Sequence, residues 1–259
     1  MDEVSNRVLV ELLKNGRISK RRIATLTGVS HSLFSYKISQ MAKRGILQGF
    51  MTYVSPTVFG LRRAIVMLPG KVEYELSSLQ IWTVEGDTIL EVYARDRETL
   101  RRRLEDLTKA HGKPSLVLEL PRGMVSLTPR DRVLVEQIVE RPRIMAKTIA
   151  ETLNLTVRTT SRHVRFLVNM DLIKVLPILD LPRTGSSMIA AFLERQTEVA
   201  PKNLVWEFLG EKEKLSLYYV WDKQDLKQIM EGLRGGLVRN VFSYKVGLPK
   251  EEQVVRHST

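Results

Sequence analysis

The sequence contains no cysteine, which excludes disulfides, thiolate metal sites and thiol nucleophiles. Histidine is scarce too, and its four copies, His31, His111, His163 and His257, lie far apart along the chain. No apolar run approaches the roughly 18 residues that a membrane-spanning helix requires. The acidic start of the chain, at Asp2 and Glu3, is unlike a secretory signal. We therefore expect a cytoplasmic protein with no metal or other cofactor and no membrane partner.

The positive charge of the chain is concentrated in two short stretches. The net charge is +12, and 43% of the 259 residues are hydrophobic, enough for several folded domains. Residues 1–50 carry an excess of six positive charges and residues 126–176 an excess of four, whereas 51–125 and 177–259 carry one each. A basic surface fits nucleic acid, an anionic membrane or an acidic partner, so the surroundings of these stretches decide between them.

The two basic stretches also resemble each other in sequence. Residues 7–11, RVLVE, recur as residues 132–136. After one extra residue in the second copy, Arg17 matches Arg143, and the alignment then runs without gaps to position 50 in the first copy and 176 in the second. The hydrophobic pattern persists more clearly than identity does. An internal repeat of this kind predicts a duplicated architecture.

The segment after each basic stretch shows the pattern of a small sheet. The order is strand, linking segment, strand, strand, helix and strand. In the first half these elements are expected at 63–68, 81–84, 89–93, 98–110 and 116–120, and in the second at 188–193, 204–208, 215–221, 225–233 and 238–246. This order predicts a ferredoxin-like βαββαβ domain in each half.

The basic stretches themselves carry the signature of a helix-turn-helix. In the first, helical periodicity runs over 5–14, a second helix is capped by Ser19, and a third is capped by Ser30 and ends at Gly45. Residues 27–30 form the short turn between the last two helices. In the second copy, residues 154–156 form the turn and 157–168 the third helix. Such a third helix inserts into the major groove of DNA.

We therefore predict an α+β protein in which a winged helix-turn-helix and a ferredoxin-like domain occur twice in tandem. The expected domains are a winged helix at 1–56, a ferredoxin-like domain at 57–122, a second winged helix at 123–181, a second ferredoxin-like domain at 182–250 and a flexible tail at 251–259. The two sheet domains should pack on each other and place both winged helices on one side. Their shared apolar face is expected to hold Tyr93, Trp206, Tyr218 and Trp221.

The faces of the third helices suggest which residues meet DNA. In the second copy Val157, Ser161, Val164 and Val168 form the expected inward stripe, and Arg158, Arg162 and Arg165 cluster on another face, where they suit phosphates and guanine edges. The first copy offers smaller polar groups there. The expected DNA contacts are Arg17, Lys20, Ser30, His31, Ser32, Tyr36, Lys37 and Lys43 in the first copy and Arg143, Lys147, Thr156, Arg158, Thr159, Arg162, His163 and Arg165 in the second.

These residues resemble a known family. The run at 15–61, NGRISKRRIATLTGVSHSLFSYKISQMAKRGILQGFMTYVSPTVFGL, is similar to the N-terminal domain of Lrp/AsnC (feast/famine) regulators, and GDTILEVYARDRETLRRRLEDL at 86–107 is similar to their effector-binding RAM domain. The chain thus looks like a tandemly duplicated, archaeal-type variant of the family. The resemblance implies a transcription regulator that binds double-stranded DNA, and sheet domains that pair as family dimers do. The family's hairpin reads glycine, two residues, aspartate, whereas here Asp87 follows Gly86 directly.

Two other function classes stay open at the level of sequence. A chromatin-like protein that coats DNA without an operator would share every charge argument. Siroheme decarboxylases share the arrangement of winged helix and sheet, but use paired histidines, and the sheet domains here contain only His111 and, in the tail, His257. A small-molecule effector and a homodimer are compatible with the sequence. The arginines at 101–103 are expected on a solvated helix face, paired with nearby acidic residues.

Overall fold

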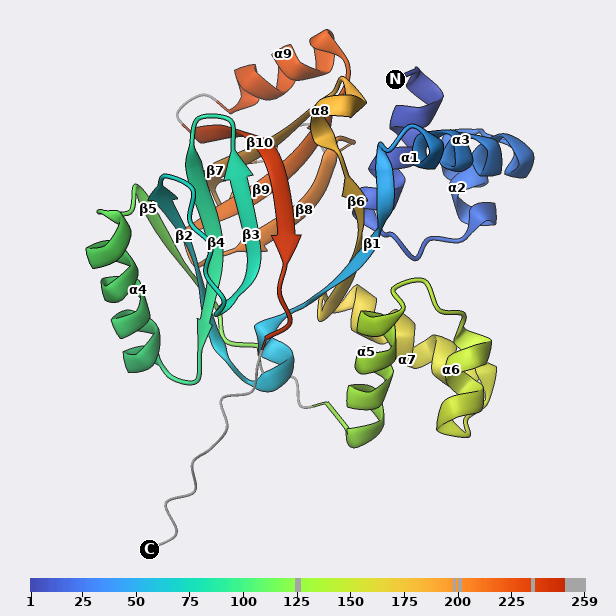
Figure 1. Ribbon diagram of the computed structural model, residues 1–259, viewed down its shortest axis with the longest axis horizontal. Coiled ribbons are helices and arrows are strands. Elements are labelled where there is room, and N and C mark those ends of the chain that lie inside the picture. The colour runs from blue at the N-terminus through green and yellow to red at the C-terminus, as the bar shows by residue number, and fades with distance from the viewer. Residues whose placement is uncertain (124–126, 198, 200–201, 234–235, 250–259) are drawn as a thin grey trace, which may run out of the picture.

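The computed structural model describes residues 1–123, 127–197, 199, 202–233 and 236–249, and its helices and strands occur in an order that repeats once (Figure 1). The first half contains α1 (Glu3–Lys14), α2 (Lys20–Thr27), α3 (His31–Lys43), β1 (Leu47–Val54), η1 (Pro56–Phe59), β2 (Arg62–Pro69), β3 (Ser77–Thr83), β4 (Asp87–Ala94), α4 (Arg97–His111) and β5 (Leu116–Leu120). The second contains α5 (Pro129–Glu140), α6 (Ala146–Leu153), α7 (Val157–Asn169), β6 (Ile173–Leu179), α8 (Leu181–Thr184), β7 (Ser187–Glu194), β8 (Leu204–Leu209), β9 (Glu213–Val220), α9 (Lys223–Gly232) and β10 (Leu237–Val246). The predicted α+β class and its duplication are confirmed.

We use four names for these groups of elements. The first winged helix is α1–α3 with β1, and the second is α5–α7 with β6. The first sheet domain is β2–β5 with α4, and the second is β7–β10 with α9. None of the described helices is long and apolar enough to cross a membrane.

The two winged helices repeat at one constant spacing. Helix α1 begins at residue 3 and α5 at residue 129, and the same offset of 126 relates α2 to α6 and α3 to α7. The extra residue expected in the second copy is therefore absent, and the alignment of 7–11 with 132–136 is wrong by one residue. Burial gives the reason: Leu134 and Ile138 take the buried places of Val8 and Leu12. The five identical residues were misleading because the spacing of the buried apolar residues, not sequence identity, defines how α5 aligns with α1.

The eight long strands of the sheet domains form one continuous sheet. Its order is β5-β2-β4-β3-β10-β7-β9-β8, so each half has the ferredoxin-like order of fourth, first, third and second strand. The halves join where β3 and β10 pair antiparallel. The first helix of the expected βαββαβ order is missing from the described residues, because a loop over 70–76 connects the first two strands and the described residues of 195–203 contain no helix either. These short connections leave one helix, α4 or α9, on the outer face of each half.

The inner faces of the two sheet domains pack on each other, as expected. One apolar cluster contains Ile65 and Ile89 of the first domain together with Phe192 and Trp206 of the second. The far edges also approach, because a Cβ atom built on Gly210 would lie 3.2 Å from the carbonyl oxygen of Glu119. The sheet therefore curls around a shared core.

The aromatic residues expected on this shared face divide between several places. Trp206 is buried in the shared core, and Tyr93 is buried on the same side of β4 as Ile89. Tyr218 was misplaced: it lies in the outer cluster of the second domain, together with Ile229 of α9. The alternation along β9 explains this, because Tyr219 takes the inward position. Trp221 is only partly buried.

A buried carboxylate ties the first winged helix to its sheet domain. Glu91 is fully buried and accepts hydrogen bonds from the Tyr53 hydroxyl at 2.7 Å and the Arg63 guanidinium at 2.8 Å. The Ser78 hydroxyl donates to it as well. Burial, followed by the nearby Glu91 charge, raises the pKa of Tyr53. Because Tyr53 lies next to the last residue of the wing strand β1, this network fixes the wing against β4.

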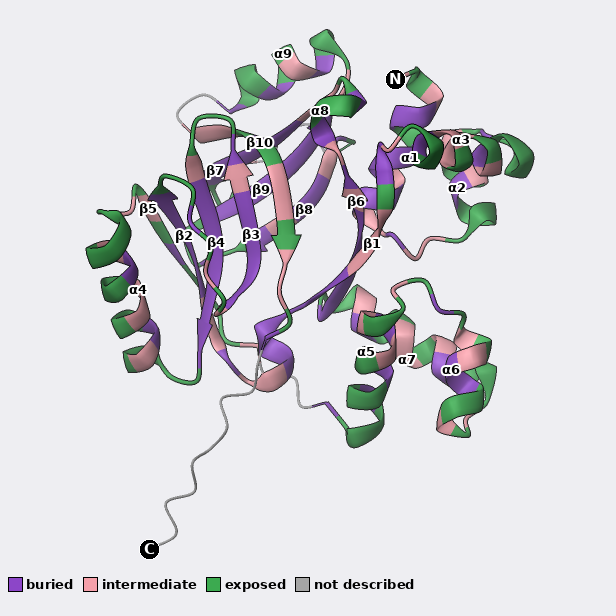
Figure 2. Ribbon diagram, in the orientation of Figure 1, coloured by how far each residue is buried: buried purple, intermediate pink, exposed green. Residues whose placement is uncertain are grey.

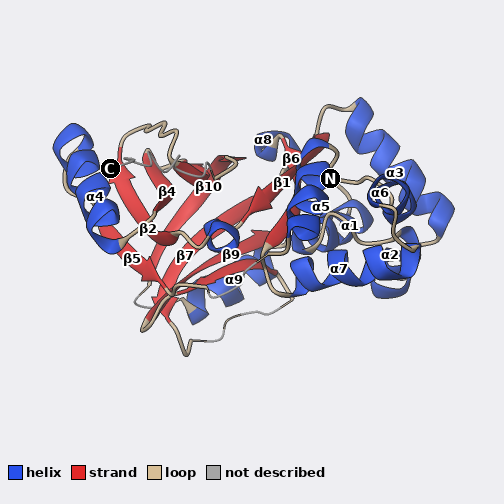
Figure 3. Ribbon diagram, turned by 90° about the horizontal axis from the view of Figure 1, so that it is seen from below, coloured by secondary structure: helices blue, strands red, loops and turns tan. Residues whose placement is uncertain are grey.

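Both winged helices lie on one side of the sheet, as predicted (Figures 1 and 3). Their wing strands β1 and β6 pair antiparallel with each other in a separate two-stranded sheet. Met51 pairs with Leu176, which is the repeat equivalent of Phe50, and Phe50 pairs with Pro177, the equivalent of Met51. This reciprocal pairing means that a local two-fold axis relates the two winged helices.

The two winged helices differ in how they are anchored. The core of the first, including Leu9, Phe34 and Met41, is continuous with the shared core of the sheets. The core of the second forms its own cluster, which contacts the first half through Phe50 and Val54 of β1 and through Val58 and Phe59 of η1. Figure 2 shows the strands largely buried and α6 and α7 largely exposed or intermediate. The two copies therefore share the same helices and strand, but only the first has a core that is continuous with the core of the sheets.

Candidate nucleic-acid interface

Local caps build the first helix-turn-helix as expected. The Ser19 hydroxyl accepts a hydrogen bond from the backbone of Arg22 at the start of α2, and Ser30 accepts one from Leu33 at the start of α3. Between them Gly28 takes the left-handed conformation, with φ of 69°, that ends α2 and turns the chain. These features orient the start of α3 toward solvent.

The second copy builds the same unit from different residues. Asn154, with φ of 50°, replaces the glycine at the turn, which fits the tolerance of asparagine for this conformation. Thr156 caps α7 through the backbone of Thr159. Met145 precedes α6 without a side-chain hydrogen bond, where the first copy has Ser19. The second helix-turn-helix is thus complete but less well capped.

The inward stripe expected for α7 is only partly right: Val164 and Val168 pack against the core of the second winged helix, whereas Val157 does not. Thr160 and Leu167 are buried, Val164 is partly buried and Val157 is 48% exposed. The inward positions of α7 are the repeat equivalents of Phe34, Ile38 and Met41 in α3. The alignment of the two copies therefore predicts them better than the apolar spacing of α7 alone. Threonine at position 160 obscured the pattern because it is polar, and its buried hydroxyl has no hydrogen-bond partner within the part of the chain that the structure describes.

The arginine face of α7 is nevertheless open to solvent. Arg158, Arg162 and Arg165 are all exposed, and no ion pair to them is found among the described residues. On α3 the equivalent positions are Ser32, Tyr36 and Ser39, also exposed. Three guanidinium groups on one helix face can bind phosphates or guanine edges, whereas hydroxyl groups read base edges with less charge.

Most of the other expected contacts are also at the surface. The structure exposes Lys20, Ser30, His31, Lys43, Arg143, Lys147 and Thr156, and it leaves Thr159 partly buried. Ser30 and Thr156 are engaged as helix caps, and the amino group of Lys20 reaches the hydroxyl of Ser35 at 3.3 Å. The guanidinium of Arg143 lies over the ring of Phe50 at 4.7 Å.

Three expected contacts face the protein instead. The guanidinium of Arg17 donates to the carbonyl oxygens of residues 142 and 144. Lys37 pairs with Asp2 at 2.7 Å, and His163 contacts Asp131 at 2.7 Å. The hydrogen bond from Lys37, followed by one from a backbone amide, lowers the pKa of Asp2 to about 2. Positions 37 and 163 are repeat equivalents, so in both copies this residue of the recognition helix is held against the first helix.

Sequence reasoning overlooked several exposed basic residues. Arg21 and Arg22 lie in the first turn of α2, and Arg44 follows α3. Their positive charge was the available signal, but they lie outside the third helix, from which the DNA contacts were mainly predicted. All three belong to the first winged helix, and only Lys147 keeps a positive charge at an equivalent position in the second.

The arginines of α4 behave as predicted for a solvated face. Arg101 pairs with Glu105 at 2.7 Å and Arg102 with Glu98 at 3.3 Å, all four exposed. Arg103 instead turns back and donates to the carbonyl oxygen of Tyr93. This helix lies on the opposite side of the sheet from the winged helices (Figure 1).

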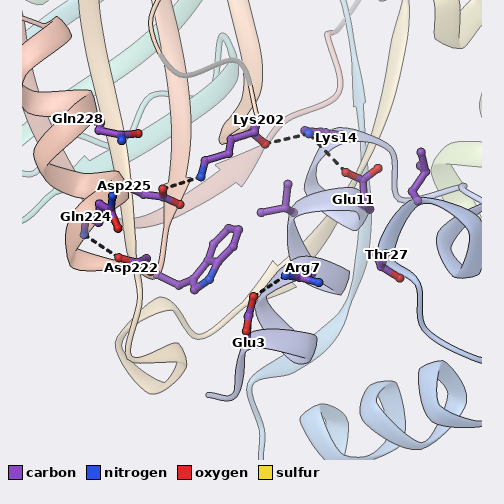
Figure 4. A pocket seen from close by; sticks show the side chains of 13 residues that line it. Glu3, Arg7, Glu11, Lys14, Thr27, Lys202, Asp222, Gln224, Asp225 and Gln228 are labelled. Atoms are coloured by element: carbon purple, nitrogen blue, oxygen red, sulfur yellow. Dashed lines mark hydrogen bonds and ion pairs between the residues drawn. The ribbon is translucent and has the colours of Figure 1, made fainter.

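A pocket of about 430 Å³ separates the first winged helix from the second sheet domain (Figure 4). Lys14 of α1 donates to the carbonyl oxygen of Lys202 across it at 3.0 Å, and Lys202 pairs with Asp225 at 2.6 Å. On the α1 wall Arg7 pairs with Glu3. The basic groups of this pocket are therefore paired with its own acidic and carbonyl groups.

Comparison with known proteins agrees with this geometry. A model described as winged helix-turn-helix DNA-binding matches residues 1–48 and again 127–174, with the offset seen in the structure. The transcriptional regulator AldR of Mycolicibacterium smegmatis is 26% identical over 144 residues, which cover 48% of this chain and 84% of that protein. The transcriptional regulator FL11 of Pyrococcus abyssi is 28% identical over 97 residues, 36% of this chain and 62% of FL11.

Two solved structures are similar in part. The siroheme decarboxylase NirDL aligns over 95% of this chain and 93% of its own, with 10% identity and a TM-score of 0.42. The regulator MtbAldR aligns over 50% of this chain and 97% of its own, with 20% identity and a TM-score of 0.32. The two matches of this one model, together with the repeated fold, show a tandemly duplicated protein with a winged helix-turn-helix in each half, and its sequence relatives are transcriptional regulators, in agreement with the predicted resemblance to the Lrp/AsnC family.

Proposed function

We propose that the protein is a transcription regulator that binds double-stranded DNA through both winged helices. The observation that carries this proposal is the pair of exposed recognition helices, α3 and α7, related by the local two-fold axis of the β1–β6 pairing. Proteins with such an arrangement contact two half-sites along one face of the duplex. A single chain here supplies both helices.

At the level of residues we propose two kinds of contact. Arg158, Arg162 and Arg165 meet phosphates or guanine edges, and Ser32 and Tyr36 meet base edges from α3. Around them the proposed phosphate contacts are Lys20, Ser30, His31, Lys43, Arg143, Lys147, Thr156 and Thr159, with Arg21, Arg22 and Arg44 added from their exposure. We leave out Arg17, Lys37 and His163, because their polar atoms are engaged within the protein.

Selection of bound sequences from a random duplex pool tests the proposal. We expect enrichment of a site with two parts, one for each recognition helix. The double variant R158A/R162A should bind the selected duplex more weakly, by about tenfold or more, since each bidentate base contact contributes about 1–3 kcal/mol. The matched control is R101A/R102A, which removes the same charge from α4. Equal loss in both variants would show that only net charge matters.

The same experiment separates a regulator from a chromatin-like protein. A regulator should prefer its selected site over random duplex by about 10³-fold or more at physiological salt. A pool that emerges without enrichment would favour coating of DNA regardless of sequence. The unequal side chains on α3 and α7 support the regulator, because a protein that reads only the backbone has no need of Tyr36 or Ser32 at exposed positions.

We further propose that the chain is not an enzyme. The described residues hold no group of three or more His, Asp or Glu side chains placed to share a metal ion. The paired histidines of a decarboxylase were not found in the sequence of the sheet domains: His111 is exposed at the end of α4, and His257 lies outside the described residues. Titration with an iron porphyrin tests this proposal: a red-shifted Soret band that H111A abolishes would contradict it.

Effector sensing and a homodimer belong to the same proposal. Pockets at the joints between winged helices and sheet domains offer places where a bound molecule would shift one part against another. The pocket in Figure 4 contacts both α1 and α9. Light scattering with and without duplex would show whether one chain or two occupies a site.

A further inference from the structure

The second winged helix lacks the support that the first receives from the sheet. Helix α1 packs against β8, and its Asn6 side chain accepts a hydrogen bond from the Tyr219 hydroxyl at 3.2 Å. Helix α5, its repeat equivalent, packs mainly on β1 and α6. Val135 and Val139 of α5 are the equivalents of Leu9 and Leu13, which are fully buried, yet Val139 is only partly buried. The duplication therefore leaves an incompletely covered apolar face on α5.

A pocket of about 480 Å³ lies over this face, and we call it the joint pocket. Its apolar wall comes from three parts of the fold: Val58 and Phe59 of η1, Val135 and Val139 of α5, and Leu248 after β10. Its volume falls in the range of about 300–1,000 Å³ that is typical of small-molecule sites. Leu248 is 51% exposed, so apolar surface is open to solvent at this place.

The rim of the joint pocket carries two carboxylates. Glu136 and Glu140 lie one helical turn apart on α5, both are exposed, and both line the pocket. Neither forms an ion pair within the described part of the chain. Arg132 lines the pocket as well, but it is engaged in an interaction of its own. Two carboxylates against the one cation of Arg132 leave the lining of this pocket with a net negative charge, on a protein whose overall net charge is +12.

We propose that the joint pocket binds an amphiphilic amine, whose apolar body fills the space between η1 and α5 and whose ammonium group lies beside Glu136 and Glu140. The apolar wall supplies most of the affinity through burial, and the carboxylates select the charge of the head group. A fatty carboxylate of the same length would meet repulsion at the rim. The occupant therefore has an apolar chain and one positive charge.

Occupancy has a consequence that rests on the proposed function. A molecule in the joint pocket contacts η1, α5 and the segment after β10 at once, so it restricts movement of the second winged helix relative to the first. Restricting that movement before DNA arrives lowers the entropy cost of binding two half-sites together. The amine should therefore increase affinity for a duplex with both half-sites and leave affinity for a single half-site of α3 unchanged.

The binding test uses three probes with the same eight-carbon chain: octylamine, octanol and octanoate. Isothermal titration of the full chain should show octylamine binding about tenfold more tightly than octanoate, since each exposed ion pair contributes up to about 1 kcal/mol. E136Q/E140Q should bring the three probes to similar affinities. E98Q/E105Q, the matched control on α4, should leave the order unchanged. V139F, which occupies the pocket with a larger side chain, should weaken all three probes.

Equal binding of octylamine and octanoate to the natural chain would overturn the proposal, and so would octylamine binding that V139F leaves intact. Duplex binding is then measured with octylamine present. The V139F variant is measured under the same conditions, because any effect that it retains comes from amine bound directly to DNA. Binding of the amine without any duplex binding would refute the proposed function and leave the pocket standing. Duplex binding without amine binding would refute the amine site in the joint pocket and leave the proposed function standing.

Discussion

Arg17 of the first winged helix donates a hydrogen bond of 2.6 Å to the carbonyl oxygen of Ile144 in the second. A second bond, also of 2.6 Å, goes to the carbonyl oxygen of Pro142. Burial, followed by the charge of Arg143, lowers the pKa of Arg17. Arg143 is the repeat equivalent of Arg17 and reaches across in the opposite direction, onto the ring of Phe50. The arginine at this position in each copy thus contacts the other winged helix and holds the two together.

Replacing Arg17 by methionine should loosen this connection. R17M removes two charge-assisted hydrogen bonds and leaves two carbonyl oxygens without these donors, so we expect a decrease of about 2 kcal/mol in the free energy of unfolding. For a chain of this size such a decrease lowers Tm by about 4–8 °C. Thermal unfolding followed by circular dichroism measures it. R7M is the control, because Arg7 forms an exposed ion pair with Glu3 of its own helix and should change Tm little.

A second prediction concerns Thr160, whose buried hydroxyl has no hydrogen-bond partner among the described residues. T160V keeps the shape of the side chain and removes the unsatisfied group, so the variant should be more stable than the natural chain by about 1 kcal/mol. T148V is the comparison, since Thr148 is partly exposed on α6. Urea unfolding would report both. A T160V chain that is less stable would mean that the hydroxyl has a partner, such as a buried water.

The architecture was accessible from the sequence because the signals were local or repeated. Caps such as Ser30 and turn residues such as Gly28 act within a few residues, so the helix-turn-helix could be placed closely. The spacing of apolar residues predicted all eight strands of the sheet domains. The register of the first helix was missed because an identical pentapeptide outweighed the spacing of Val8 and Leu12.

What the sequence did not predict depends on contacts between distant segments. The sequence predicts Arg17 as an exposed basic residue next to a helix-turn-helix. The carbonyl groups that it binds lie about 125 residues away along the chain. Lys37 and His163 likewise face carboxylates of the first helices. The joining of the sheet domains through β3 and β10 has no local signal either. Composition indicates a basic surface, but only the fold shows which of its basic residues are exposed and which are bonded within the protein.

A third prediction concerns Lys174, which is buried in β6. Its amino group donates to the carbonyl oxygens of Lys14 and Val205 and lies 5.4 Å from the centre of the Trp206 ring. Burial lowers its pKa from 10.5 to about 8, against the opposing charge of Asp171. Between these values the unfolded chain binds more protons than the folded one, so stability should rise with pH from about 8 to 10.

The comparison variant for this effect is K174M, which lacks the titrating group but keeps an extended apolar chain. The natural chain should gain up to about 3 kcal/mol relative to K174M across this range, at no more than about 1.4 kcal/mol per pH unit. Urea unfolding at pH 7.5, 8.5 and 9.5 measures the difference. Parallel pH profiles for the two chains would contradict the lowered pKa.

The last prediction sets the two recognition helices against each other. Arg158 and Arg162 carry charge where Ser32 and Tyr36 carry hydroxyl groups, so α7 should supply more affinity and α3 more discrimination. Removing one side chain that neutralises a phosphate reduces the slope of log K against log salt by about 0.9. R158A/R162A should therefore lower both affinity and this slope, whereas S32A/Y36A should leave the slope unchanged and relax sequence preference in one half of the site.

The selected site should be asymmetric, because the two helices differ at these exposed positions. A palindromic site would show that two chains each contribute the same winged helix, and loss of all binding in S32A/Y36A alone would assign DNA recognition to the first winged helix.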